Sequence, residues 1–340
     1  MSKILDDVAA VYYPIYFTSC SILHILLFYL IFNKTSKVLR TMRYFLYPSN
    51  FFNYVLAAFT FFLQFRTVHN TRSLAIMCQG PCKYFGAVWC FNGYIFILSV
   101  ATAGGVLNIH TLYYRMITIK YHDNMKFRIF IFGLWYLFPI AIIVLSYIPP
   151  IDLDSVYLET LQAHPDYNFE PYRKFGGFAN SHSIFMTLVT FTLVLLTIVA
   201  PTLGYSWRRQ TLKVLDRNIN SLSAQSVTQF RALVHGLGLQ IMLPLFCYVP
   251  VGFFYIFNKY VGTQILISQY TVCFMITLPA LFDPILQIYF IVPYRRAAKR
   301  ILTCSRSERI ENNENSLRRN TVTLWNGRKT SSPNQMQNLT

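Results

Sequence analysis

The stretches LHILLFYLIF at residues 23–32 and TLVLLTIVAPTL at residues 192–203 decide the fold. Both are apolar around the whole helical circumference, and neither alternates apolar with polar residues as the strands of a membrane barrel do. Both lie inside longer runs without Lys, Arg, Asp or Glu. A helix needs about 20 apolar residues to cross a bilayer, and backbone groups in lipid must bond to one another, which favours helices. The two stretches therefore predict membrane-spanning helices.

Seven uncharged runs of at least 22 residues follow one another along the 340-residue chain. They cover residues 8–33, 44–65, 84–114, 129–151, 175–207, 232–258 and 260–282. Charged residues make up 13% of the chain and apolar residues 54%, which excludes a disordered protein and leaves too little charge for an ordinary soluble domain. We expect an all-α membrane protein with seven transmembrane helices, at about 10–33, 44–65, 85–114, 129–149, 183–207, 232–257 and 264–292.

The distribution of basic residues predicts the orientation. The net charge is +17, from 30 basic and 13 acidic residues. With the N-terminus outside, 23 of the basic residues fall in cytoplasmic segments, namely 34–43, 115–128, 208–231 and the tail from 294. Basic residues accumulate on the cytoplasmic side of membrane proteins. The basic excess therefore indicates contact with membrane lipid and requires no nucleic-acid partner.

These boundaries divide the chain into four parts. We expect an extracellular N-terminus at 1–9, a seven-helix bundle at 10–293, a helix on the membrane surface at 294–304 and a disordered cytoplasmic tail at 305–340. Cys304 follows the surface helix and is a candidate for palmitoylation, or else a free thiol. The sequons at Asn33 and Asn338 fall on the cytoplasmic side, so we expect no N-glycan.

Asp283 is the only Asp, Glu, Lys or Arg inside the seven predicted spans. A carboxylate at this depth is costly and normally faces the bundle interior, water or a partner. Pro284 removes a backbone hydrogen bond and loosens the helix beside it. We interpret the pair as an activation switch with Asn53, Asn108 or His235 as polar partner. The alternative is a protonated carboxyl that only holds the helix packing.

Arg115 ends the third run at its inner boundary. It either engages a cytoplasmic protein or locks the sixth helix, or it is an ordinary interfacial arginine whose charge reaches the headgroups.

Cys78, Cys82 and Cys90 gather before and at the start of the third run, on the predicted outer side. Disulfides persist in that compartment. The three cysteines either form a local disulfide in some combination or remain thiols. A metal site needs more ligands than this segment supplies.

A small-molecule pocket is expected among the outer halves of the third, fifth, sixth and seventh helices. Such pockets are mostly apolar with a few polar groups. The candidate lining residues are Trp89, Asn92, Tyr94, Phe246, Tyr248, Phe253, Gln269 and Tyr270.

Four stretches also resemble a known family. They are GPCKYFG at 80–86, TLYYR at 111–115, RALVHGLGLQIMLPLFCYVP at 231–250 and FDPILQIYFIVPYRR at 282–296. They resemble nematode serpentine chemoreceptors of the Str superfamily, and the GPC segment most resembles serpentine receptor class delta. Rhodopsin-like receptors differ: Tyr114 replaces the acid common before Arg115, Asp283 replaces an Asn before proline, and the sixth helix has no Trp.

The resemblance implies a G-protein-coupled chemosensory receptor for a small environmental chemical such as an odorant, placed in the plasma membrane or a sensory ciliary membrane. Its implied partners are the ligand and a heterotrimeric G protein. A transporter or ligand-gated channel is the alternative. We expect no enzyme activity, no cofactor and no resident metal, because the sequence has no catalytic pair and no phosphate-binding glycine loop.

Overall fold

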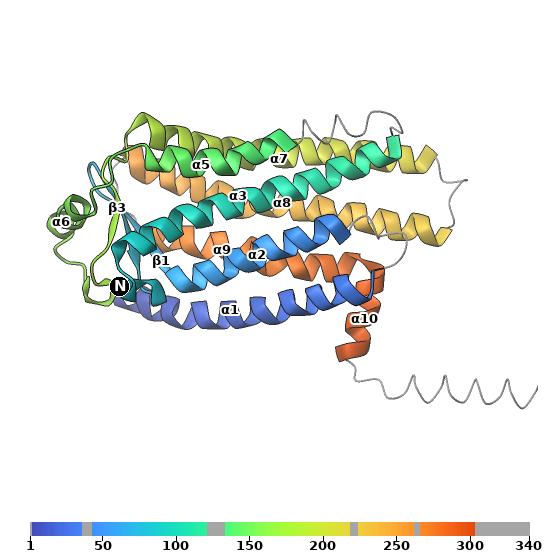
Figure 1. The fold of residues 1–340 in the computed structure, drawn as a ribbon, viewed down its shortest axis with the longest axis horizontal. Coiled ribbons are helices and arrows are strands. Elements are labelled where there is room, and N and C mark those ends of the chain that lie inside the picture. Colours follow the sequence, from blue (N-terminus) through green and yellow to red (C-terminus); the bar gives the residue numbers. More distant parts are fainter. Residues whose placement is uncertain (1, 36–42, 121–132, 218–223, 262–265, 303–340) are drawn as a thin grey trace, which may run out of the picture. The chain divides into compact units, whose positions relative to one another are not determined.

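A computed structural model describes residues 2–35, 43–120, 133–217, 224–261 and 266–302 (Figure 1). Five of its helices are long and apolar enough to cross a membrane. They are α1 (Ser2–Asn33), α3 (Ala87–Lys120), α7 (Ile184–Arg217), α8 (Ala224–Val261) and α9 (Leu266–Phe290). The expected class, an α-helical membrane protein, is confirmed.

The other two uncharged runs form less apolar or shorter helices. α2 (Arg43–Leu63) has 21 residues and buries polar side chains, including Ser49, Asn50, Asn53 and Thr60, which lower its mean hydropathy. The fourth run begins in residues that the structure does not describe and then forms a short turn, η3 (Leu134–Tyr136), and α5 (Leu137–Tyr147). α2 therefore uses its polar face inside the protein.

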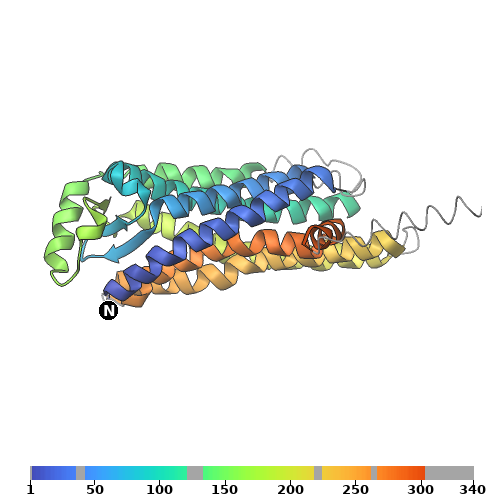
Figure 2. The same cartoon turned by 90° about the horizontal axis from the view of Figure 1, so that it is seen from below.

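α3 is the central helix of residues 1–295, which form one compact unit. It contacts α2, α5, α7 and α8, while α1 packs on α2 and α9, and α8 packs on α7 and α9. The helices run side by side along the bundle (Figures 1 and 2). A helix surrounded by others must be apolar on most of its circumference, as the sequence of α3 is.

Several boundaries differ from the sequence-based ones. The segment expected as an N-terminal tail, residues 1–9, is part of α1 from Ser2 onward. α7 continues to Arg217 and α8 begins at Ala224, so both helices extend past the uncharged runs. Charged residues end a lipid-spanning run without ending a helix, because Arg, Lys and Gln are good helix formers.

α10 (Val292–Leu302) follows α9 directly and carries Arg295, Arg296, Lys299 and Arg300 beside apolar residues. Its position on a membrane surface stays a prediction. Cys304, with its proposed palmitoylation, and the tail 305–340 lie outside the described residues.

A three-stranded antiparallel sheet, which the sequence analysis did not predict, lies at the end of the bundle where α1 begins (Figures 1 and 2). β1 (Phe65–His69) pairs with β2 (Leu74–Cys78), and β2 pairs with β3 (Gly176–Phe178). α6 (Leu153–Ala163) contacts β2 and β3. We call this sheet, together with α6 and the turn η4 (Glu170–Tyr172), the cap.

The strands are buried on both faces. Successive strand residues point to opposite faces, so Leu74, Ile76 and Cys78 join the core of the bundle, whereas Ala75 and Met77 pack under the outer part of the cap. A strand buried on both faces reads as a continuous apolar run, and the β2 sequence LAIMC therefore resembles a helix fragment.

Gly177 permits the β2–β3 pairing. A Cβ at this position would lie 1.9 Å from the carbonyl oxygen of Leu74. Only glycine allows two backbones to approach so closely.

Candidate functional site: a cavity beside a buried carboxyl

A cavity of about 390 Å³ lies among α3, α7 and α8. This volume lies within the range of small-molecule sites. Most of the lining side chains are apolar, and none of the described residues that line it is a Lys, Arg, Asp or Glu. Its polar lining consists of the tyrosines Tyr94, Tyr248 and Tyr255 together with Asn53, Thr102, Asn108, Ser146, Thr190, Thr197 and Gln240. The cavity therefore suits an uncharged molecule with few hydrogen-bonding groups.

The eight residues expected to line a pocket separate into several places. Tyr94 of α3 and Tyr248 and Phe253 of α8 line the cavity. Trp89 and Asn92 instead line a second hollow of about 590 Å³ on another side of α3, where Asn92 accepts a hydrogen bond from Tyr147 (2.8 Å).

Three more of the expected lining residues lie elsewhere. Phe246 is 69% exposed on the surface of α8, whereas Gln269 and Tyr270 are buried in a polar cluster beneath the cap. α3 and α8 carry apolar side chains on all their faces. Their sequences therefore show no amphipathic pattern that identifies the face turned toward the cavity.

Asp283 lies at the edge of the cavity and is buried. Its Oδ2 accepts hydrogen bonds from Asn53 Nδ2 (2.6 Å) and Gln287 Nε2 (2.9 Å), and its Oδ1 accepts one from Gln240 Nε2 (2.6 Å). The three amides come from α2, α9 and α8. Because Asn53 and Gln240 also line the cavity, one layer of side chains separates the carboxyl from the cavity.

The structure selects among the expected partners of Asp283. Asn53 bonds to it, whereas Asn108 accepts a hydrogen bond from Ser49 (3.0 Å), and His235 bonds to Arg208 (2.6 Å).

Sequence reasoning missed Gln240 and Gln287. Gln287 stands one helical turn after Asp283, a spacing that places two side chains together, and Gln240 is a rare polar residue in its uncharged run. Both signals were present in the sequence.

A second polar group joins α1, α2 and α9 next to this site. The ring of His24 lies 2.6 Å from Asn50 Oδ1 through Nδ1 and 3.0 Å from the Ala280 carbonyl oxygen through Nε2. Asn50 also donates to the His24 carbonyl oxygen (3.1 Å). Ala280 lies three residues before Asp283, so one segment of α9 receives polar contacts from α1, α2 and α8.

Of the other two proposed switch residues, one is fully placed and one only in part. Pro284 lies inside α9 directly after Asp283. Arg115 lies near the C-terminal end of α3, but its side chain is outside the described residues.

A buried ion pair anchors the cap to the bundle. Arg66 of β1 lies 3.8 Å from Asp6 of α1 and donates two hydrogen bonds to Gln269 Oε1 of α9 (2.7 and 3.0 Å). Tyr172 and Tyr270 both donate to Asp6 Oδ1. Burial raises the pKa of the Tyr172 hydroxyl, so it remains a donor. These hydrogen bonds offset the free-energy cost of removing the charges of Arg66 and Asp6 from water.

Two aromatic rings lie beside the guanidinium group of Arg66. Its guanidinium lies 4.9 Å from the ring centre of Tyr167 and 4.7 Å from that of Tyr270. The sequence analysis did not single out Arg66, because its partners are far away in the sequence.

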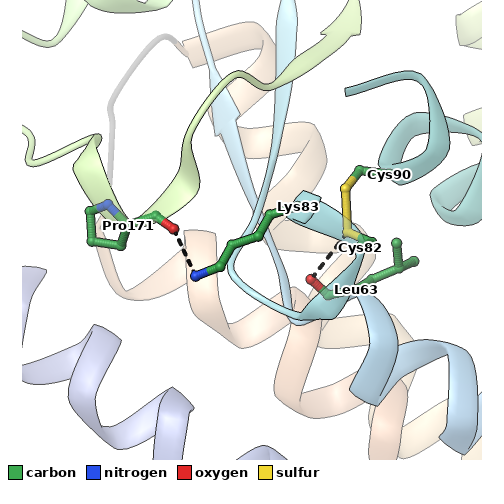
Figure 3. The surroundings of a disulfide bond; sticks show 5 residues. All are labelled: Leu63, Cys82, Lys83, Cys90 and Pro171. Carbon is green, nitrogen blue, oxygen red and sulfur yellow. Dashed lines mark hydrogen bonds between the residues drawn. A yellow bond between two sulfur atoms is a disulfide. The ribbon is translucent and has the colours of Figure 1, made fainter. Parts of the chain in front are cut away.

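The disulfide joins Cys82 to Cys90 (Figure 3). It connects the turn η2 (Pro81–Tyr84) to α3, with a Cα–Cα distance of 5.6 Å. Next to it, Lys83 Nζ donates to the Pro171 carbonyl oxygen (3.2 Å), which joins this turn to the cap (Figure 3).

Cys78 is a buried thiol, and its sulfur lies within 4.8 Å of the other two. Burial raises the pKa of the Cys78 thiol, so little thiolate forms. Of the alternatives left open by the sequence, the structure contains a local disulfide with one thiol beside it. Two sulfurs that share a covalent bond are poor metal ligands, because metals bind thiolates.

Comparisons with known proteins place these features in context. The family model of "Serpentine type 7TM GPCR chemoreceptor Srd" matches residues 9–300. "Serpentine receptor class delta-63" of Caenorhabditis elegans is 35% identical over 280 residues, which cover 82% of this chain and 86% of that protein. "Serpentine receptor class delta-59" of the same organism is 29% identical and covers 87% and 92% of the two chains. The family expected from the four sequence stretches is confirmed.

Proposed function

The chain belongs to the Srd family of serpentine seven-transmembrane chemoreceptors, and on that premise we propose that it binds a small environmental chemical in the cavity among α3, α7 and α8. Binding shifts the helix packing and activates a heterotrimeric G protein. The receptor works in the plasma membrane, in a sensory cilium, with its N-terminus outside. A chemoreceptor family and several apolar helices make it a multi-pass membrane protein of a non-enzymatic family.

The observation that supports this proposal best is the shared role of Asn53 and Gln240. Each donates its amide to Asp283, and each also lines the cavity. A ligand that contacts either amide changes the hydrogen bonding of a carboxyl that joins α2, α8 and α9. A ligand shifts a conformational equilibrium only through different affinities for the two states, and this arrangement provides such a difference.

The proposed orientation rests on charge and on the disulfide. α7 ends and α8 begins at the end of the bundle away from the cap (Figure 1), and Arg208, Arg209, Lys213 and Arg217 lie in the last turns of α7. The Cys82–Cys90 disulfide lies next to the cap, and such bonds persist outside the cell. The basic helix ends and Arg115 then form the surface for the G protein.

Signalling in cells tests the function. The full chain is expressed in cells that lack it, an odorant panel is screened with a G-protein reporter, and the best agonist is repeated on Asp283→Asn and Arg115→Ala. We expect Asp283→Asn to shift agonist potency or basal signal about tenfold, since an amide cannot accept as a carboxylate does. Phe246→Leu, which changes an exposed residue of α8, is the matched control.

The outcomes separate the alternatives. If both variants signal as the unmodified receptor does, the switch assignment is wrong. If the agonist opens a conductance in liposomes without a G protein, the channel alternative replaces the receptor.

A further inference from the structure

The outer end of the cavity is covered by the cap. Leu74 of β2 and Phe178 of β3 are paired in the sheet, line the cavity and are 1% and 4% exposed. The sheet lies across the end of the bundle in both views (Figures 1 and 2). Buried apolar side chains at this end exclude water from the direct route between the outer solution and the cavity.

The cap is also fixed in place. The Arg66–Asp6 ion pair joins β1 to α1, the two bonds from Arg66 to Gln269 join β1 to α9, and Lys83 joins the turn η2 to the segment that contains Pro171. Opening the cap would leave two charges in an apolar setting without partners, which is costly.

The wall between α7 and α8 is different. Four cavity-lining side chains are exposed, and all four lie on these helices: Ile198 is 49% exposed, Val249 43%, Phe253 64% and Ile256 39%. A side chain that lines a cavity and is also exposed lies at its mouth. These residues belong to helices that are candidates to span the membrane, so the mouth faces lipid.

A glycine leaves space between α7 and α8 in this wall. A Cβ at Gly252 of α8 would lie 3.5 Å from Val194 Cγ2 of α7, an ordinary contact distance, with no other neighbour within 4 Å. A larger side chain at Gly252 therefore extends into the gap between the two helices.

The chemistry of the lining restricts the ligand. No described lining residue is charged at neutral pH, so a charged ligand would be desolvated without a partner. Asn53 and Gln240 use their amide NH₂ groups on Asp283, which leaves their carbonyl oxygens as acceptors. The Oδ1 of Asn53 points toward cavity-lining Gly104, since it lies 3.7 Å from a Cβ built there. An acceptor selects a ligand with a hydrogen-bond donor.

We infer that the cavity takes an uncharged, lipophilic molecule with a hydroxyl or similar donor, and that this molecule reaches it from the bilayer between α7 and α8. This inference rests on the proposal that the cavity is the ligand site. It predicts that the receptor senses compounds by their concentration in the membrane, with potency that follows lipid partitioning among ligands of equal fit.

Photolabelling tests the route without any signalling. The full chain is placed in phosphatidylcholine nanodiscs without G protein and exposed to one of two probes. The first is a long-chain alcohol with a diazirine on its alkyl chain, and the second is a water-soluble, sulfonated diazirine that does not enter lipid. Mass spectrometry locates the labelled residues. We expect the alcohol to label Tyr94, Thr197 and Tyr248, excess unlabelled alcohol to compete, and the sulfonated probe to leave all three unlabelled.

One variant narrows the opening of the cavity between α7 and α8, and a matched control leaves that opening unchanged. Gly252→Leu fills the gap beside Val194 and is expected to lower alcohol labelling of Tyr94 about tenfold or more, since added methylene groups change an apolar fit by this factor. Phe246→Trp adds bulk to the same helix away from the cavity and is expected to leave labelling unchanged. An intact Cys82–Cys90 disulfide and an unchanged melting temperature show that each variant is folded.

Labelling of the cavity by the sulfonated probe, or unchanged alcohol labelling in Gly252→Leu, overturns the inference. These results do not depend on signalling. Competitive labelling from the lipid side supports the inference even if no odorant activates a G protein, and aqueous labelling overturns it even if the receptor signals.

Discussion

The cap and the α7–α8 wall enclose the same cavity by opposite means. The cap is held by a buried ion pair, two tyrosine hydroxyls on Asp6 and a nearby disulfide. The α7–α8 wall consists mainly of apolar side chains around the cavity, several of them exposed, and its contacts Arg208–His235 (2.6 Å) and Lys259–Thr187 (3.5 Å) involve residues that do not line the cavity. Buried charges have few acceptable geometries, whereas apolar contacts can rearrange at low cost. Polar bonding therefore makes the cap rigid, whereas the mainly apolar wall beside the cavity stays adaptable.

Removing the cation of the cap should have the largest effect. Arg66→Met leaves Asp6 buried without its counter-charge and is expected to lower the free energy of unfolding by about 3–5 kcal/mol. Thermal melting in detergent measures the loss. The matched control is Lys174→Met, which breaks the fully exposed Lys174–Asp154 pair (2.7 Å) and should leave the melting temperature unchanged.

The double variant Asp6→Asn, Arg66→Met separates lost packing from unpaired charge. We expect it to recover a large part of the loss, since two neutral groups need no counter-charge. If the double variant is as unstable as Arg66→Met alone, charge does not hold the cap.

Breaking the disulfide should have the next largest effect. Cys82 and Cys90 are separated by eight residues, and closing a loop of this length stabilises a protein by about 2–3 kcal/mol. We expect Cys82→Ala to lower the melting temperature and to abolish its sensitivity to a reductant. Cys247→Ala changes a buried free thiol of α8 and should retain that sensitivity. A reductant-sensitive Cys82→Ala would contradict the assigned pairing.

Acid should weaken the cap. Burial and the positive charge of Lys259 lower the pKa of His69 in β1 from its ordinary 6.5 to about 4. The unfolded chain therefore binds more protons between these values, and stability decreases as the pH falls through this window. From pH 7.5 to pH 5 the loss is at most about 2 kcal/mol. His69→Gln should flatten the pH profile of the melting temperature, and an unchanged profile would contradict the assignment.

Two glycines on the α7–α8 wall should give the most local effects. A Cβ at Gly204 would lie 2.7 Å from Ile241 Cγ2, whereas a Cβ at Gly252 would be in ordinary contact with Val194. We expect Gly204→Ala to lower stability by about 1–3 kcal/mol through overpacking. Gly252→Ala should be neutral or stabilising by up to about 1 kcal/mol, because Ala favours helix. Equal melting temperatures for the two variants would mean that the wall is uniformly packed.

Much of the bundle could be predicted from the sequence because it depends on local composition. A long uncharged apolar run can satisfy its backbone in lipid only as a helix, so the runs at 8–33, 84–114 and 232–258 correspond to α1, α3 and α8. Burying a carboxyl group among apolar residues costs free energy unless polar groups bind it. The sequence therefore identified Asp283 as unusual and predicted polar partners for it.

The sheet and the lining of the cavity could not be predicted in this way. β3 has three residues, two of them glycine, and is a strand only because β2 lies beside it. Phe246 and Phe253 look alike in the sequence, yet one faces outward and the other lines the cavity. Arg66 and Asp6 are separated by most of α1, all of α2 and the residues between these helices.

The amino-acid sequence by itself determined the class, the family and the position of the costly carboxyl, because each follows from residues close together in the chain or from motifs that relatives share. Only the tertiary structure decided which cysteines pair, which faces of α3 and α8 enclose the cavity, and which amides hold Asp283. These features depend on contacts between helices that are distant in sequence, and the free energy of such contacts is set by their geometry in space.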